Sequence, residues 1–173
     1  MRNTPVRMAL GAALALALPG CATLGLALSR ALPDQGHECP GTLIPTEEMH
    51  TEFLLEQDVR VRGGGLDWAF TLVSQKRGPT LVLVGLDPFG AKLFTLTQRG
   101  TQVSVERPGG RLPLPPVNLL RDLHRTRFRG PEAAPEPGVS IEPLAPGSVR
   151  IRHVACGYET TLVTLKEQAL DAP

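Results

Sequence analysis

Side chains that can carry out covalent or acid–base chemistry occur along this chain without the spacing that catalysis requires. No serine lies within a Gly-x-Ser-x-Gly elbow, the strained turn that exposes a hydrolase nucleophile. The four histidines include neither His-Glu-x-x-His nor His-x-His, spacings that bring two imidazoles to one metal ion. Gly63–Gly65 precedes a strand pattern, whereas a phosphate-binding loop opens a helix. The sequence therefore predicts a protein that is not an enzyme and that uses no catalytic residue, metal or cofactor.

Cys21 is the reactive side chain with the most informative surroundings. Two arginines, an apolar run of 11 residues (Met8–Leu18) and Leu-Pro-Gly precede it, which is the layout of a secretory signal peptide. The run is too short to span a bilayer, although apolar residues continue to Leu28 and leave an uncleaved anchor as the alternative. A cysteine directly after the cut resembles the lipobox of bacterial lipoproteins. The resemblance implies cleavage after Gly20 and attachment of acyl chains, such as palmitate, to Cys21.

The other two cysteines, Cys39 and Cys156, then form an even pair in an exported and oxidising compartment, so we expect a disulfide between them. The alternative is a metal site that adds His37 and His153 to the two thiolates. No close-spaced ligand pair such as Cys-x-x-Cys supports that alternative. The disulfide is the favoured interpretation.

Charge and composition exclude one class of partner and indicate many short elements. Removing Arg2 and Arg7 with the signal leaves 16 of the 18 basic side chains against 17 acidic ones. Because nucleic-acid binding depends on clustered positive charge, this balance predicts no nucleic-acid partner. The 17 prolines and 18 glycines favour turns between short strands over long helices.

The elements that must position any site are mostly strands. Leu66, Trp68, Phe70 and Leu72 occupy every second position, which is typical of a strand with one buried face. Five such segments between 53 and 106 predict an antiparallel meander, Pro116 begins an amphipathic helix, and a hairpin follows near the end. We expect a mainly β (α+β) fold: a curved antiparallel sheet or half-open β-barrel of about seven or eight strands with one inserted helix. The expected boundaries are a signal peptide at 1–20, a lipidated tether at 21–48, one β-rich domain at 49–168 and a tail at 169–173.

Two segments resemble a known family. The run LDPFGAKLFTLTQRG and the later run LPPVNLLRDLHRTRF resemble a family of small bacterial lipoproteins of unknown function, domain-of-unknown-function family 3261. The likeness covers roughly residues 53–128. This family is in turn similar to the outer-membrane lipoprotein-carrier fold, in which a half-open barrel covered by helices holds acyl chains in its concave face. The resemblance implies that fold and the handling of lipid.

Two groups of side chains are candidates for binding, each with a structural alternative. The first is apolar and either packs beneath the helix as core or lines a hydrophobic cleft that binds a ligand: Trp68, Phe70, Leu72, Phe89, Phe94, Leu120 and Leu123. The second is basic and either forms a solvated helix face or contacts lipid head groups or an acidic partner: Arg121, Arg125 and Arg127.

The function that we expect is that of a lipid-anchored cell-envelope lipoprotein. It would bind or transfer a hydrophobic, acyl-type ligand without chemistry. The alternative is an assembly lipoprotein that docks an envelope protein through a sheet edge or the basic helix. Its partners would be the membrane, reached by the anchor, and a lipid or other hydrophobic molecule. The residue after Cys21 is Ala22, and in this position the chain resembles lipoproteins that are sent to the outer membrane and face the periplasm.

Overall fold

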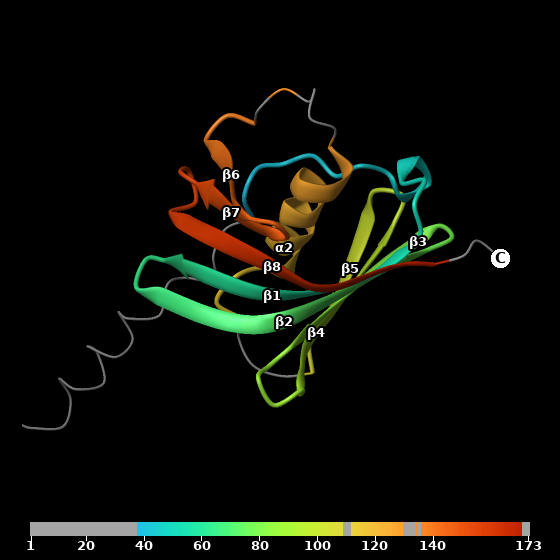
Figure 1. Cartoon of the computed structure of the whole chain (residues 1–173), viewed down its shortest axis with the longest axis horizontal. Coiled ribbons are helices and arrows are strands. Elements are labelled where there is room, and N and C mark those ends of the chain that lie inside the picture. The colour runs from blue at the N-terminus through green and yellow to red at the C-terminus, as the bar shows by residue number, and fades with distance from the viewer. Residues whose placement is uncertain (1–37, 109–111, 130–133, 135, 171–173) are drawn as a thin grey trace, which may run out of the picture. The chain divides into compact units, whose positions relative to one another are not determined.

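Within the described residues, one curved antiparallel sheet with one α-helix on its concave side makes up the fold (Figure 1). The computed structural model describes residues 38–108, 112–129, 134 and 136–170. The eight strands are ordered β5-β4-β3-β2-β1-β8-β7-β6, and the sheet is not closed. Their bounds are β1 Phe53–Gly63, β2 Leu66–Arg77, β3 Thr80–Leu86, β4 Lys92–Arg99, β5 Gln102–Glu106, β6 Val139–Ala145, β7 Ser148–His153 and β8 Tyr158–Ala169. The predicted fold class is confirmed.

The strands follow the alternation of the sequence. On β1 the buried side chains are those at positions 53, 55, 57, 59 and 61, which share the concave face. β1 runs without interruption through the polar Gln57 and Asp58 and pairs with β2 from Phe53 to Gly63. The β1–β2 turn uses Gly64 at φ 57° and Gly65 at φ 84°, a region that glycine enters without a steric penalty. The five-strand meander is therefore present as predicted.

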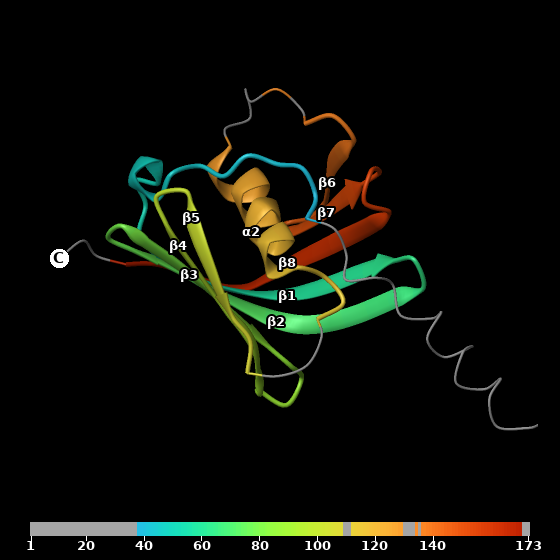
Figure 2. The ribbon, with the colours of Figure 1, turned by 180° about the vertical axis from the view of Figure 1, so that it is seen from behind.

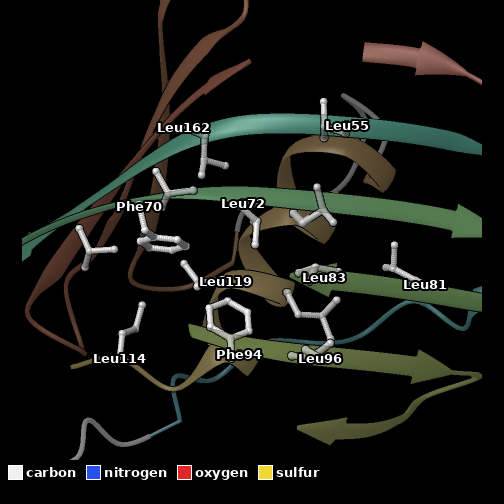
Figure 3. Close-up of a cluster of buried hydrophobic side chains, with 14 of the residues drawn as sticks. Leu55, Phe70, Leu72, Leu81, Leu83, Phe94, Leu96, Leu114, Leu119 and Leu162 are labelled. Atoms are coloured by element: carbon white, nitrogen blue, oxygen red, sulfur yellow. The ribbon is translucent and has the colours of Figure 1, made fainter. Parts of the chain in front are cut away.

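The helix begins at Pro116 and runs in two parts, α2 Pro116–Leu123 and the π-helical η2 His124–Phe128. Proline is well suited to the first helical position because that N–H has no partner within the helix. Leu119, Leu120 and Leu123 are each at most 1% exposed and pack on the sheet. Figure 3 shows Leu119 facing core side chains of β1 to β4, such as Leu72 and Phe94. Burial of a leucine contributes about 1.5–3 kcal/mol, so these three leucines hold the helix against the concave face of the sheet.

The helix is covered on its other side as well. We call residues 38–45 the strap, because they cross the helix on the side opposite the sheet (Figures 1 and 2). The short 3-10 helix η1 Thr46–Glu48 follows, and Thr46 is fully buried. Residues 38–48 were expected in the tether; they instead pack on the domain. The N–H groups of Cys39 and Ile44 donate to Asn118 and His124 of the helix, and the N–H of Thr46 donates to the carbonyl of Gly100. The signal peptide, Cys21 and the rest of the tether lie outside the described residues.

The end of the domain also lies slightly later than expected. Strand β8 reaches Ala169, and the N–H of Leu170 donates to the carbonyl of Glu52 at 3.1 Å. In the described part of the chain, no helix combines the length and the apolar character that crossing a membrane takes.

Candidate ligand-binding groove

An open groove of about 410 Å³ lies between β1, the end of the helix and the β6–β7 hairpin. Its base contains Leu55 of β1 and Leu123 of α2, which are 2% and 1% exposed. Ile141, Pro143 and Val149 form the wall on the hairpin side. The groove therefore offers an apolar surface next to the hydrophobic core and in contact with solvent.

The groove exists because the helix covers only part of the concave face. In β6, Ile141 pairs with Ile151 of β7 and Pro143 pairs with Val149. Ile151 is fully buried, whereas Ile141 remains 46% exposed. Strand β6 is an edge strand, where proline is tolerated because no neighbouring strand needs its N–H. The uncovered apolar side chains of β6 and β7 thus form one side of a binding surface.

Gln57 is the polar residue in the otherwise apolar concave row of β1. It is 6% exposed and lines the groove. Its Nε2 donates to Thr164 Oγ1 of β8 at 3.4 Å, and its Oε1 is buried without a hydrogen-bond partner among the described residues. A bulge between Glu56 and Gln57 shifts the register with β8 at this point. A buried polar side chain in a core row requires an explanation, and the position of Gln57 beside the groove offers one.

Arg127 supplies positive charge to the groove. Its guanidinium carbon lies 4.2 Å from the centre of the Phe53 ring, and Nη2 donates to Glu167 Oε1 at 2.6 Å. The Arg127 side chain is 22% exposed. This hydrogen bond, with the positive charge behind it, lowers the pKa of Glu167 below its usual range. The carboxylate lies at the outer side of the pair, since it is 49% exposed.

Arg125 also lines the groove, but its hydrogen bonds go to residues on the strap side of the helix. Its side chain is 2% exposed; Nη1 donates to Asp122 at 2.9 Å, and Nε and Nη2 donate to Glu136 at 2.8 and 2.6 Å. Nη2 also donates to the carbonyl of Pro40 in the strap at 2.7 Å. Arg121 bonds Glu38 of the strap at 3.2 Å. Arg121 and Arg125 therefore form neither the solvated face nor the exposed basic contact surface that the sequence left open, because the strap and two carboxylates cover and neutralise them.

The strap is fixed by side chains that lie far away in the sequence. Cys39 and Cys156 form a disulfide that links the strap to the β7–β8 turn, as the cysteine count predicts. The N–H of Cys39 donates to Asn118 Oδ1 at 2.9 Å. No set of three potential metal ligands is present among the described residues, and His37 of the alternative metal site lies outside them. The disulfide is thus one of several links between the strap and the domain.

His124 is a second anchor of the strap and was not singled out from the sequence. Its Nδ1 accepts from the N–H of Ile44 at 2.9 Å, and Nε2 lies 2.9 Å from Gln98 Oε1. With Nδ1 as an acceptor, the imidazole is neutral and carries its proton on Nε2. Burial, and then the charges of Arg129 and Arg125, lower the pKa of His124 to about 4. Its position between Leu123 and Arg125 gave little sign of this role.

Asp122 and His153 form a further buried pair behind the helix. The two side chains are at most 1% exposed, and His153 Nε2 lies 2.9 Å from Asp122 Oδ1. Tyr158 stacks on His153 with ring centres 4.4 Å apart, and burial followed by the charge of Asp122 raises the pKa of Tyr158. Both side chains are buried and neither lines the groove, so the pair serves the fold.

The expected apolar binding face is divided among several places. Phe70, Leu72, Phe94 and Leu120 are at most 4% exposed and belong to the core between the sheet and the helix. Leu123 is shared between this core and the groove. Trp68 is half-buried and stacks on Phe70 with ring centres 4.2 Å apart.

Phe89 differs from the rest of that set because it is 94% exposed. It lies in the β3–β4 turn, where Asp87 Oδ1 accepts from the N–H groups of Phe89 and Ala91 at 2.9 and 2.8 Å. The turn geometry takes Phe89 away from the concave face. Sequence reasoning missed Ile141 and Val149, which lie in or next to a proline-rich stretch where strand alternation is hard to recognise. A glutamine within the apolar row of β1 was the available signal for Gln57.

Comparison with known proteins supports the resemblance seen in the sequence. Residues 54–136 match a family described as "Protein of unknown function (DUF3261)". The matched segment includes β1 from its second residue, β2 to β5 and the whole helix, and therefore one side of the groove. No curated protein matches the chain. The comparison thus relates residues 54–136, just under half of the chain, to a family of unknown function.

Proposed function

We propose that this protein is a lipid-anchored lipoprotein of the bacterial cell envelope that binds or transfers a hydrophobic, acyl-type ligand in the groove, without catalysis. The observation that carries the proposal is the apolar wall of β6 and β7, which remains open to solvent beside the core. The volume of about 410 Å³ lies within the range of roughly 300–1,000 Å³ that is typical of small-molecule sites.

Because the core beneath the helix is filled, the groove is the better candidate for the ligand site. Leu119, Leu120 and Leu123 occupy the concave face, so a ligand could enter there only by displacing the helix. At the groove, a chain that covers Ile141 and Val149 removes exposed apolar area from water without that displacement. Each Å² so covered contributes about 25 cal/mol. The energetically accessible site is therefore the groove.

Two features of the sequence support the envelope location. Cys21 follows a signal-like segment and resembles a lipidated cysteine, which would hold the domain at a membrane. The pairing of Cys39 with Cys156 suits an oxidising compartment outside the cytoplasm. We propose the outer membrane, with the domain facing the periplasm, because Ala22 follows Cys21.

The test uses the full chain with Cys21→Ser, so that no attached acyl chain competes for the site. An uncharged fatty alcohol with a terminal fluorophore is titrated, and fluorescence reports binding. We expect saturable binding that Ile141→Asn weakens at least tenfold. Phe89→Asn is the matched control, because it changes an apolar side chain that is more exposed and lies outside the groove. Non-saturable binding, or equal effects of the two substitutions, would contradict the proposal.

A second function has one observation in its favour. Strand β6 is an unpaired edge of the sheet, and its Ile141 and Leu144 are 46% and 41% exposed. Such an edge can accept a strand from an envelope protein. In that case the alcohol probe would not saturate. A peptide that adds to the edge would protect the backbone N–H groups of β6 from hydrogen exchange, whereas a groove ligand would leave their exchange nearly unchanged.

A further inference from the structure

We propose that the ligand of the groove is a single-chain amphiphile with an anionic head group, and that Arg127 binds this head group. The inference rests on the proposed function, because it names the class of molecule that the same groove takes. Its apolar chain would lie along Ile141, Pro143 and Val149, over Leu55 and Leu123.

The charge of the lining favours an anion. Among the described residues, the lining includes Arg125 and Arg127 but no acidic side chain. Arg125 is already bonded to Asp122, Glu136 and the Pro40 carbonyl, so its charge is neutralised within the domain. Arg127 is the cation of this lining that is left to meet a ligand.

Arg127 can accept a new partner without losing its position. A guanidinium has five N–H donors, and in the described structure the hydrogen bond of Arg127 is that from Nη2 to Glu167. The stacking over Phe53, at 4.2 Å, holds the guanidinium at the rim independently of that bond. Because Glu167 is half-exposed, its pair with Arg127 contributes little to stability, and its carboxylate can turn toward water. A carboxylate or phosphate can then form a bidentate pair with Arg127.

A hydroxyl in the same lining can assist. Thr164 Oγ1 accepts a hydrogen bond from Gln57 Nε2 at 3.4 Å. That contact uses an acceptor site of the hydroxyl and leaves its O–H available to donate to an anion. Gln57 would thus act as a positioning residue for Thr164. This role gives a reason for a buried polar side chain in an apolar row.

The experiment compares four compounds with the same chain and different head groups. Dodecanoate, dodecyl phosphate, dodecanol and dodecyltrimethylammonium compete with the uncharged fluorescent alcohol for the full chain carrying Cys21→Ser. We expect both anions to bind at least tenfold more tightly than dodecanol, and the cation to bind most weakly. Their advantage should shrink as salt is raised, since the charge at the rim is partly exposed. The carboxylate and phosphate arms then distinguish a fatty acid from a phospholipid-type head group.

Variants identify the residue responsible. Arg127→Gln should remove the tenfold preference for anions and leave the affinity for dodecanol unchanged, and Arg127→Lys should restore most of the preference. Arg129→Gln is the matched control, because Arg129 bonds Glu136 and lies outside the groove lining. Equal affinities of dodecanoate and dodecanol for the unmodified groove would overturn the inference while the proposed function stands. If neither compound displaces the probe, both fail.

Discussion

Arg125 and Arg127 lie two residues apart on the same helix and belong to two different regions of the molecule. Arg125 is buried beneath the strap, where Asp122 and Glu136 surround its guanidinium. Arg127 lies at the rim of the groove, where a half-exposed Glu167 is its acidic partner. The strap side is polar, and acidic side chains neutralise its arginines. The groove side is apolar and open to solvent, and its remaining cation, Arg127, has one half-exposed acidic partner.

The difference indicates where stability and function reside. On the strap side, a disulfide, a buried ion cluster and His124 hold residues 38–45 on the helix. Substitutions there should change the free energy of unfolding. On the groove side, Ile141, Gln57 and Arg127 either remain exposed or are incompletely satisfied, so substitutions there should change binding more than stability. The following predictions test this division, from the largest expected effect to the smallest.

Removal of the disulfide should have the largest effect. The double substitution Cys39→Ser/Cys156→Ser opens a loop with a sequence separation of 117 residues. The chain-entropy estimate for a loop of this size is about 4–5 kcal/mol. We expect the free energy of unfolding, measured by urea denaturation, to fall by that amount, and reductant to have no further effect on the variant. A loss below about 1 kcal/mol would show that the strap is held mainly by its other contacts.

The two arginines offer the sharpest comparison. Arg125→Gln leaves Asp122 and Glu136 buried without their cation, and should lower the free energy of unfolding by about 3–5 kcal/mol. Arg127→Gln breaks a partly exposed pair, and should lower it by less than about 1 kcal/mol. Urea denaturation of both variants at neutral pH measures the difference. Similar losses for both would remove the distinction between the two sides of the helix.

Acid should loosen the strap side through His124. The folded protein lowers the pKa of His124 from 6.5 to about 4, so the folded state disfavours the protonated form. The stability that neutral His124 provides is complete above pH 6.5 and is lost as pH falls from 6.5 through 4, by about 3 kcal/mol in all. Protonation would also remove the acceptor that Ile44 uses.

Unfolding free energies across this pH range, compared with those of His124→Asn, isolate the contribution of the imidazole. An asparagine Oδ1 can replace Nδ1 as the acceptor, so the slope should flatten in the variant. The lowered pKa of Glu167 produces a loss in the same direction, and it remains in both proteins. Equal slopes would show that His124 does not titrate as the structure implies.

Gln57→Leu should have a small effect on stability, similar in size to that of Arg127→Gln but of opposite sign. The substitution removes a buried amide whose oxygen has no hydrogen-bond partner among the described residues. It introduces an apolar side chain like the others in this row of β1. We expect thermal unfolding to show a gain of about 1 kcal/mol. The same variant should bind dodecanoate more weakly, because Thr164 loses its positioning partner. A loss of stability with unchanged dodecanoate binding would assign Gln57 to the fold alone.

The sequence predicted those parts of the molecule that follow from periodicity. The alternation from Leu66 to Leu72 located β2, and Pro116 marked the start of the helix. The strap escaped prediction because it has no period. Its position depends on single hydrogen bonds that its N–H groups donate to Asn118 and His124, about 80 residues away, which local patterns do not reveal.

The groove escaped prediction for a related reason. Strand β6 lies in a proline-rich segment, and its structure comes from pairing with β7. The apolar residues that alternate most clearly, such as Phe70 and Leu72, are the ones that the helix buries. Apolar surface remains exposed on β6, where the alternation of apolar and polar residues is weakest. The sequence therefore predicted the core between sheet and helix better than the groove beside it.

Mapping the bound chain by NMR is the most direct test of the central claim. The ¹⁵N-labelled full chain with Cys21→Ser is titrated with dodecanoate. The account predicts saturable shifts of the amide signals of residues 123–127, 141–149 and 164, with little change at 58, 69 and 71 on the opposite face of the sheet. Shifts confined to that opposite face or to the turn at Phe89, or no saturable shifts, would contradict the assignment of the groove as the binding site.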